Sequence, residues 1–242
     1  MRPLLELTGI RKHFGGIHAC QGLTLRVAEG ESLGLIGPNG AGKTTVFSLI
    51  MGEHRQNAGT IHFNGEEVSR VPTHGRVKRG IARTYQVPRP FGDMDVVSNI
   101  RVGMMPDSLW RMLAKGPDHE AEIELALSVG FAEADIHRLP GELSMGDLRK
   151  LELARALATH PRIILLDEVF AGLTVGEIAQ MSALLARKRA EGMTFVIVSH
   201  DLRSLEPLVD RAVAMTFGRL VAAGNFEDVL ANEEVRAAYL GH

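Results

Sequence analysis

One eight-residue stretch limits what this chain can fold into more than any other. It consists of Gly37, Pro38, Asn39, Gly40, Ala41, Gly42, Lys43 and Thr44 and fits the pattern G-x-x-x-x-G-K-[ST]. An apolar run at 32–36 precedes it, and a helical pattern follows. Glycines allow successive backbone N–H groups to turn inward around phosphate oxygens, and the start of a helix adds the positive end of its dipole. The stretch predicts a phosphate-binding loop; the alternative is a glycine-rich turn before a helix.

The end of this stretch carries side chains suited to a triphosphate and its metal ion. Lys43 would reach the β- and γ-phosphates, and the hydroxyl of Thr44 is a hard oxygen ligand for Mg²⁺. Thr45 follows directly, and we expect it to line the same site. The predicted ligand is therefore a nucleoside triphosphate with Mg²⁺.

Short apolar runs alternate with helical patterns along most of the chain, as at 32–37 and 162–168. This alternation is typical of a mostly parallel sheet with helices on both faces. The first 30 residues and 60–68 instead indicate antiparallel ribbons, with Asn64-Gly65 as a hairpin turn. We predict an α/β P-loop NTPase fold with a mostly parallel sheet, an N-terminal antiparallel β subdomain and an inserted helical subdomain.

We expect a single domain over residues 1–242. Its parts would be the nucleotide-binding core with the β subdomain at 1–86 and 152–222, the helical subdomain at 87–151, and a C-terminal helical tail at 223–242. The stretch 87–151 lacks strand signals and opens with VPRPFG, in which two prolines favour an extended link.

The run RIILLDE at 162–168 ends in two acids. Four apolar residues before Asp167 indicate a central strand whose carboxyl end lies where α/β sheets bind ligands. There Asp167 would hold Mg²⁺, directly or through water, and Glu168 would act as general base on the water that attacks the γ-phosphate. The alternative is a strand that ends in two solvated acids.

Two polar residues end other predicted strands. His200 follows TFVIVS, and its ring N–H would donate to a γ-phosphate oxygen; the alternative is a lone strand-end histidine with a satisfied ring. Gln86 ends RTYQ before the helical insert, and its amide would reach both the metal and the attacking water. Taken singly, neither residue identifies a site.

Composition argues against several classes of protein. The formal net charge is −2 and there is no long basic run, which disfavours a nucleic-acid-binding face. Cys20 is the single cysteine, so no intrachain disulfide forms. The N-terminus has no apolar region of signal-peptide length, and the most apolar stretches are far shorter than the roughly 20 residues that cross a bilayer. We expect a soluble protein that meets a membrane only through a partner.

These motifs, together with LSMG at 143–146 and KHFGG at 12–16, resemble the nucleotide-binding subunit of ABC transporters across essentially the whole chain. The resemblance implies ATP with Mg²⁺ and a fixed set of roles. Gly37 to Thr44 would be the Walker A loop, and IILLDE would be Walker B, with Glu168 as the catalytic residue. Gln86 would be the Q-loop residue and His200 the switch histidine. Phe14 would stack on the adenine. The alternative for Phe14 is a strand-end core aromatic.

Ser144 and Gly146 resemble the signature motif, which in this family caps the γ-phosphate of ATP on the opposite subunit of a head-to-tail dimer. A serine N-cap with free backbone N–H groups is an anion site without base or metal. The stretch departs from the usual LSGGQ at Met145 and Asp147. Asp147 completes an S-x-x-D capping pattern, but at about 6 Å its charge would repel a triphosphate by on the order of 2 to 3 kcal/mol per unit charge.

Two further departures follow the Walker B strand. Val169 stands where proline commonly follows the Asp-Glu pair, and Thr174 stands where aspartate or asparagine usually links the two sites across the dimer. These departures concern the rate of turnover rather than nucleotide binding.

The strings FGG, RTYQ, LLDE-x-x-AGL and ANEEVRAAYLG look most like ATPases of branched-chain amino acid importers, with urea and amide importers close behind. The resemblance implies a cytoplasmic ATPase, peripheral on the inner face of the cell membrane. It would bind two transmembrane permease subunits and a second ATPase subunit, alike or different, and a solute-binding protein would act indirectly. We expect the permease to dock near Tyr85, Val87, Pro88 and Phe91.

Three other functions stay open from the sequence. An ABC ATPase that acts on nucleic acid or the ribosome is disfavoured because the chain has one cassette and no basic face. A weakly hydrolysing, nucleotide-gated regulatory module is kept open by the altered signature. A small-molecule kinase is disfavoured because Glu168 and His200 suit the activation of water.

Overall fold

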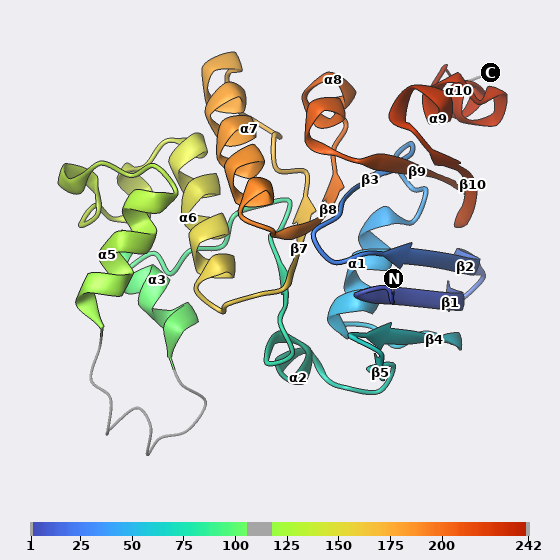
Figure 1. Cartoon of the computed structure of the whole chain (residues 1–242), viewed down its shortest axis with the longest axis horizontal. Coiled ribbons are helices and arrows are strands. Elements are labelled where there is room, and N and C mark those ends of the chain that lie inside the picture. The colour runs from blue at the N-terminus through green and yellow to red at the C-terminus, as the bar shows by residue number, and fades with distance from the viewer. Residues whose placement is uncertain (1, 106–117, 241–242) are drawn as a thin grey trace.

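The computed structural model describes residues 2–105 and 118–240 (Figure 1). Two sheets and their covering helices make up this part of the chain. The strands are β1 (Leu5–Phe14), β2 (Ile17–Val27), β3 (Ser32–Ile36), β4 (Ala58–Phe63), β5 (Glu66–Glu67), β6 (Ile81–Arg83), β7 (Ile163–Asp167), β8 (Thr194–Val198), β9 (Arg211–Thr216) and β10 (Arg219–Gly224). The α-helices are α1 (Lys43–Met51), α2 (Thr73–Val77), α3 (Val96–Met104), α5 (His119–Ser128), α6 (Met145–Leu157), α7 (Val175–Ala190), α8 (Leu202–Leu205), α9 (Phe226–Ala231) and α10 (Glu233–Leu240). Short 3₁₀ turns lie at η1 (Glu133–Asp135), η2 (Pro140–Glu142) and η3 (Glu206–Leu208).

A six-stranded sheet with the order β10-β9-β3-β8-β7-β6 forms the centre of the molecule. Its strands run parallel except β10, which pairs antiparallel with β9. Strands β3, β7 and β8 are buried along their whole length, which explains their continuous apolar sequences. The predicted α/β fold with a mostly parallel sheet is therefore confirmed.

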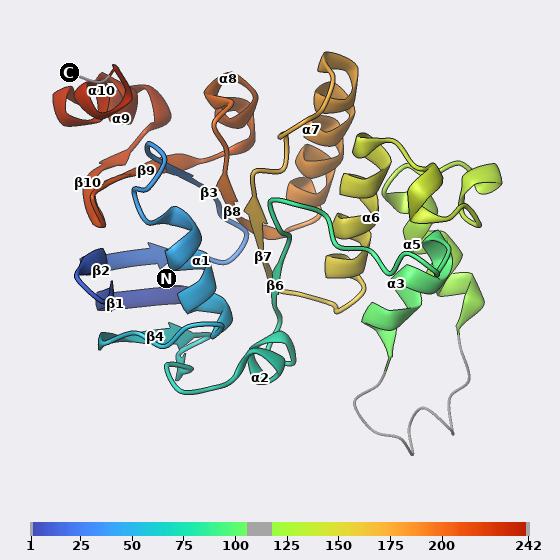
Figure 2. The same cartoon turned by 180° about the vertical axis from the view of Figure 1, so that it is seen from behind.

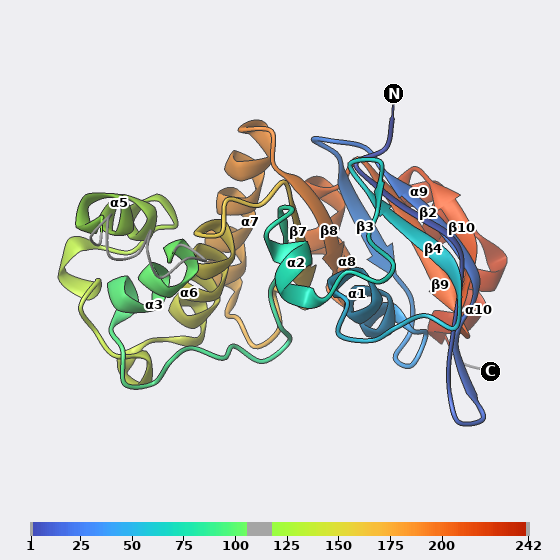
Figure 3. The ribbon, with the colours of Figure 1, turned by 90° about the horizontal axis from the view of Figure 1, so that it is seen from below.

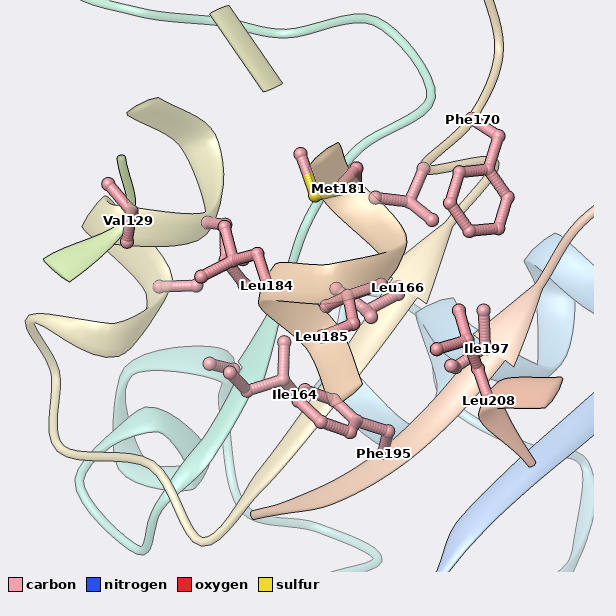
Figure 4. Close-up of a cluster of buried hydrophobic side chains, with 14 of the residues drawn as sticks. Val129, Ile164, Leu166, Phe170, Met181, Leu184, Leu185, Phe195, Ile197 and Leu208 are labelled. Atoms are coloured by element: carbon pink, nitrogen blue, oxygen red, sulfur yellow. The ribbon is translucent and has the colours of Figure 1, made fainter. Parts of the chain in front are cut away.

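Each face of this sheet has its own hydrophobic core. Ile164 and Leu166 of β7 pack on the side that α7 covers, whereas Ile163 and Leu165 belong to the cluster on the opposite side. Figure 4 shows the first cluster, in which the α7 side chains lie over β7 and β8. Because successive strand residues point to opposite faces, an uninterrupted apolar strand supplies both cores at once.

A second, antiparallel sheet packs over the opposite face, with the order β2-β1-β4-β5. Helix α1 contributes Phe47 and Leu49 to the core that this sheet shares with β3. The β4–β5 hairpin turns at Asn64 and Gly65, which both have positive φ (50° and 77°). The predicted N-terminal antiparallel sheet and its Asn-Gly turn are therefore confirmed.

Helices α3, α5 and α6 gather at the end of the molecule away from the antiparallel sheet (Figures 1, 2 and 3). Asp95 and Asp118 begin α3 and α5, where each carboxylate accepts a backbone N–H three residues on. The apolar faces of α3 and α5 meet around Ile100 and Ala126. Strand β6 leads into this helical group, and α6 leads back to β7. Within the described ranges, no helix has the length and apolar character to span a membrane.

Candidate functional site

The loop between β3 and α1 depends on glycines at two close contacts. A Cβ added at Gly37 would lie 2.2 Å from the carbonyl oxygen of Met215, and one at Gly42 would lie 2.4 Å from that of Ala19. Both glycines also have positive φ (149° and 104°), which side chains disfavour. Gly42 precedes the nine-residue α1 without a side-chain cap, so the first N–H groups of the helix are open to a ligand.

Lys43 lies folded into this loop. Its Nζ donates to the carbonyl oxygens of Gly37 at 2.5 Å and Pro38 at 3.0 Å. Burial lowers the pKa of the Lys43 ammonium, while the negative charges of Glu168 and Asp167 raise it. An ammonium that donates to neutral carbonyls can exchange them for the charged oxygens of a phosphate, which are stronger acceptors.

The loop opens into a cavity of about 320 Å³. Most residues that the sequence assigned to the nucleotide line it together, although they come from distant parts of the chain. They are Phe14, Asn39, Gly40, Ala41, Gly42, Lys43, Thr44, Thr45, Gln86, Glu168 and His200. Gly37, Pro38 and Asp167 are not among the lining residues, and neither are Ser144 and Gly146, which lie at the start of α6.

Phe14 stands at the end of β1 with its ring partly exposed to this cavity. The ring meets His54 edge to face, with centroids 5.1 Å apart, and Lys12 Nζ lies 4.6 Å from its centroid. An exposed aromatic at the mouth of the cavity suits stacking against a base.

Asp167 is buried at the end of β7, where it forms an ion pair that the sequence did not indicate. Its Oδ2 accepts from Arg83 Nη2 at 2.7 Å, and the two side chains are 3% and 4% exposed. Arg83 also donates to Glu53 at 2.9 Å and to the Ser48 hydroxyl at 3.1 Å. Because β6 and β7 are parallel neighbours, residues at their carboxyl ends meet; position 83 could have been inferred only from that pairing.

Glu168 and His200 contact each other at the ends of β7 and β8. The backbone N–H of His200 donates to Glu168 Oε2 at 3.1 Å, and the ring Nε2 lies 3.3 Å from Oε1. Glu168 has φ of +52°, unusual for a residue with a side chain, and its own N–H bonds Val198 at 2.9 Å. Such a strained position at a cavity is typical of a functional residue. His200 therefore lies where it holds the carboxylate of Glu168.

Helix α6 holds the loop that carries Gln86. Arg149 donates to the carbonyls of Tyr85 at 2.8 Å and Gln86 at 2.7 Å, and Glu152 accepts from the Tyr85 N–H at 2.6 Å. Both charged side chains are buried, 3.4 Å apart. Burial raises the pKa of Glu152, against the lowering effect of the Tyr85 N–H and of Arg149. This pair was not predicted from the sequence, although two opposite charges at i and i+3 on an otherwise apolar helix face were its signal.

The start of α6 is capped within the chain. The Ser144 hydroxyl accepts from the Asp147 N–H at 3.1 Å and donates to the Asp147 carboxylate at 2.9 Å. Lys150 lies 3.0 Å from the same carboxylate, so part of its charge is balanced locally. The Gly146 N–H donates to Glu177 Oε1 at 3.0 Å. This helix start is thus well formed, and it does not line the cavity of its own subunit.

Comparison with known proteins places the chain in one family. A family model described as ABC transporter matches residues 20–171. The high-affinity branched-chain amino acid transport ATP-binding protein BraF of Pseudomonas aeruginosa is 36% identical over 99% of this chain and 98% of its own length. LivG of Escherichia coli, described in the same words, is 33% identical with the same coverage. The ADP conformation of MJ1267, an ATP-binding cassette of an ABC transporter, matches the whole of both chains with a TM-score of 0.89 and 28% identity. With its loop, its two strand-end acids and its fold, this chain belongs to the ABC transporter ATP-binding family.

Proposed function

We propose that this chain is the ATP-hydrolysing subunit of an ABC importer that carries branched-chain amino acids or a related small polar solute. ATP binding would close it on a second ATPase subunit, and hydrolysis would reopen the pair. One observation supports this most: Gln86, Glu168 and His200 line the same cavity as the loop 39–45. Full-length similarity to two branched-chain amino acid transport ATP-binding proteins supports the choice of solute.

Lys43 and the loop amides would bind the phosphates. The Lys43 ammonium would leave the carbonyls of Gly37 and Pro38 for the β- and γ-phosphate oxygens, which are stronger partners because they are charged. The open N–H groups at the start of α1 point into the same loop and add their partial positive charge. Phe14 would hold the adenine at the outer end of the cavity.

Thr44, Gln86 and Asp167 fit Mg²⁺ because they offer hydroxyl, amide and carboxylate oxygens, the hard ligands that this ion takes. The buried charge of Asp167 is stabilised by Arg83, which keeps a carboxylate available at this position. When bound, Mg²⁺ neutralises charge on the phosphate oxygens. Asp167 would act directly or through water.

Glu168 would take the proton of the attacking water. His200 contacts both oxygens of the Glu168 carboxylate: its backbone N–H donates to Oε2, and its ring Nε2 lies beside Oε1. A fixed carboxylate next to the γ-phosphate orients the water and accepts its proton on an oxygen. The bound proton would leave with the products as the site opens.

Ser144 and Gly146 would complete the site of a second subunit, because they do not line the cavity of their own. A two-fold dimer would bring each α6 start to the partner's ATP. The carboxylate of Asp147 is already bonded to the Ser144 hydroxyl and to Lys150. That bond to the signature serine favours a slow-turnover variant of the same ATPase as the second candidate function.

The permease would dock in a groove beside the Gln86 loop. A cavity of about 270 Å³ there is lined by Tyr85, Arg89, Glu152 and Arg155, among others. Val87 and Phe91, two residues before and after the lining residue Arg89 in the chain, are 68% and 43% exposed. The groove shares Tyr85 and Glu152 with the contacts that hold Gln86, so a docked permease segment would sense the nucleotide site.

Reconstitution with the permease subunits in liposomes tests this proposal. We expect ATP-driven uptake of labelled leucine in preference to urea, and none with Glu168→Gln. Val87→Glu should lower both uptake and copurification with the permease, whereas Leu127→Glu on α5, another partly exposed apolar position, should change neither. Uptake that persists with Glu168→Gln would contradict the assigned chemistry, and unchanged uptake with Val87→Glu would show that the groove is placed wrongly.

A further inference from the structure

The last helix of the described chain reaches the nucleotide loop. The Tyr239 hydroxyl in α10 accepts a hydrogen bond from the Gly37 N–H at 2.7 Å, between residues 202 positions apart. Figures 1 and 2 both show the loop that leads into α1 close to α9 and α10. The end of the chain therefore contacts the first residue of the Walker A sequence.

Helix α10 is anchored on the sheet rather than loosely attached. The Thr216 hydroxyl at the end of β9 donates to Glu234 Oε1 at 3.3 Å, and Val235 is buried in the core. Strand β9 pairs with β3, the strand that leads into the nucleotide loop. Tyr239 is thus held at a fixed place beside Gly37.

The peptide groups of Gly37 are held on both sides. The Tyr239 hydroxyl accepts from the Gly37 N–H, and Lys43 Nζ donates to the Gly37 carbonyl oxygen at 2.5 Å. The contact with the Met215 carbonyl allows no side chain at this residue. If Lys43 turned to a bound phosphate, the carbonyl of Gly37 would lose this partner, while the contact of its N–H with Tyr239 would remain.

The surroundings keep the Tyr239 hydroxyl protonated at neutral pH. Burial raises its pKa, the hydrogen bond from Gly37 lowers it, and the negative charge of Glu168 raises it again. The hydroxyl therefore accepts from Gly37 and keeps its own proton.

We propose that Tyr239 is a positioning residue of the nucleotide site, whose hydroxyl fixes the Gly37 peptide while Lys43 moves from the loop carbonyls to phosphate. Nucleotide affinity then depends on the C-terminal helix. This inference rests on the proposed nucleotide site.

Tyr239→Phe isolates the hydroxyl because it keeps the ring that fills the space. Without its acceptor the Gly37 N–H loses its partner, the empty loop becomes less ordered, and nucleotide binding weakens about three- to tenfold. Glu234→Gln is the matched control on the same helix, since its amide oxygen still accepts from Thr216 and does not touch the loop.

The test titrates the full chain with mant-ADP and Mg²⁺ and follows amide exchange at Gly37 without nucleotide. We expect Tyr239→Phe to weaken mant-ADP binding and to speed exchange at Gly37, with a melting temperature close to that of Glu234→Gln. Unchanged affinity, even with a lower melting temperature, would reduce Tyr239 to a packing role and overturn the inference. If the unmodified chain fails to bind mant-ADP, the proposed site is wrong, and the inference falls with it.

Discussion

Ion pairs hold the side chains of Arg83 and Asp167 at the carboxyl end of the parallel sheet. Arg83 joins the carboxylates of Asp167 and Glu53, and its guanidinium lies 4.9 Å from the centroid of the Tyr85 ring. Loss of one partner from a buried ion pair leaves the other charge without compensation, which costs more than the pair contributes. Arg83 therefore holds the buried carboxylate of Asp167 in place.

Substitution of Arg83 should destabilise the protein far more than loss of a surface pair. We expect Arg83→Gln to lower the free energy of unfolding by about 3 kcal/mol because Asp167 stays buried without its partner. Arg26→Gln removes an exposed pair with Glu6 and should cost less than about 1 kcal/mol. Urea denaturation of both variants measures the free energy of unfolding. Equal losses of free energy would show that the buried pair stabilises the fold no more than the exposed one.

Elements meet at their ends to bring these residues together. Glu177, in the first turn of α7, accepts from Thr174 and also from the Gly146 N–H of α6. Its Oε2 lies 2.8 Å from the Thr174 hydroxyl, so Thr174, a departure from the family pattern, serves as a helix cap. The carboxylate of Glu177 thus joins the starts of α6 and α7, a contact that was not predicted from the sequence.

This junction predicts a pH dependence of stability. Hydrogen bonds from Thr174, chiefly its backbone N–H, lower the pKa of Glu177 below its ordinary value of 4.5. A carboxylate with a lowered folded pKa adds stability above the unfolded pKa, and that stability is lost as the pH falls through the folded pKa. The deficit of Glu177→Gln should therefore be largest near pH 7 and shrink below pH 4.5.

Urea denaturation over this pH range measures the deficit. Glu124→Gln, an exposed position on α5, is the control for loss of one surface charge. A deficit for Glu177→Gln that stays constant with pH, or grows in acid, would contradict a role for the charged carboxylate.

Those parts of the candidate site that form short continuous motifs could be predicted from the sequence. The loop Gly37 to Thr44 and the pair Asp167-Glu168 each lie in one continuous stretch, and the fold around them follows from strand–helix alternation. The contacts of Arg83 with Asp167, of Arg149 with the carbonyls of Tyr85 and Gln86, and of Tyr239 with Gly37 were not predicted, because they span 84, 63 to 64 and 202 positions. Such contacts depend on strand order and helix docking, which no local pattern specifies.

At the scale of the whole molecule, the cavity lined by the loop 39–45 and the start of α6 lie in different parts of the fold. Phe14 and the loop 39–45 lie on the side of the antiparallel sheet, whereas Ser144 begins a helix that packs with α3 and α7. The Gln86 loop, held by Arg149 and Glu152, connects the two. On our proposal, such a subunit would carry half of each of two sites, and a second subunit would complete both.

The oligomeric state of Glu168→Gln with and without Mg²⁺ and ATP, measured by light scattering, tests this account most directly. The variant should bind ATP without hydrolysing it and form a dimer only when ATP is present. Ser144→Arg in the same chain should prevent the dimer while ATP still binds, because Ser144 does not line the cavity of its own chain and, on this proposal, would meet the nucleotide of the partner. An ATP-saturated Glu168→Gln chain that stays monomeric, both alone and with any ATPase chain that copurifies with its permease, would contradict the account.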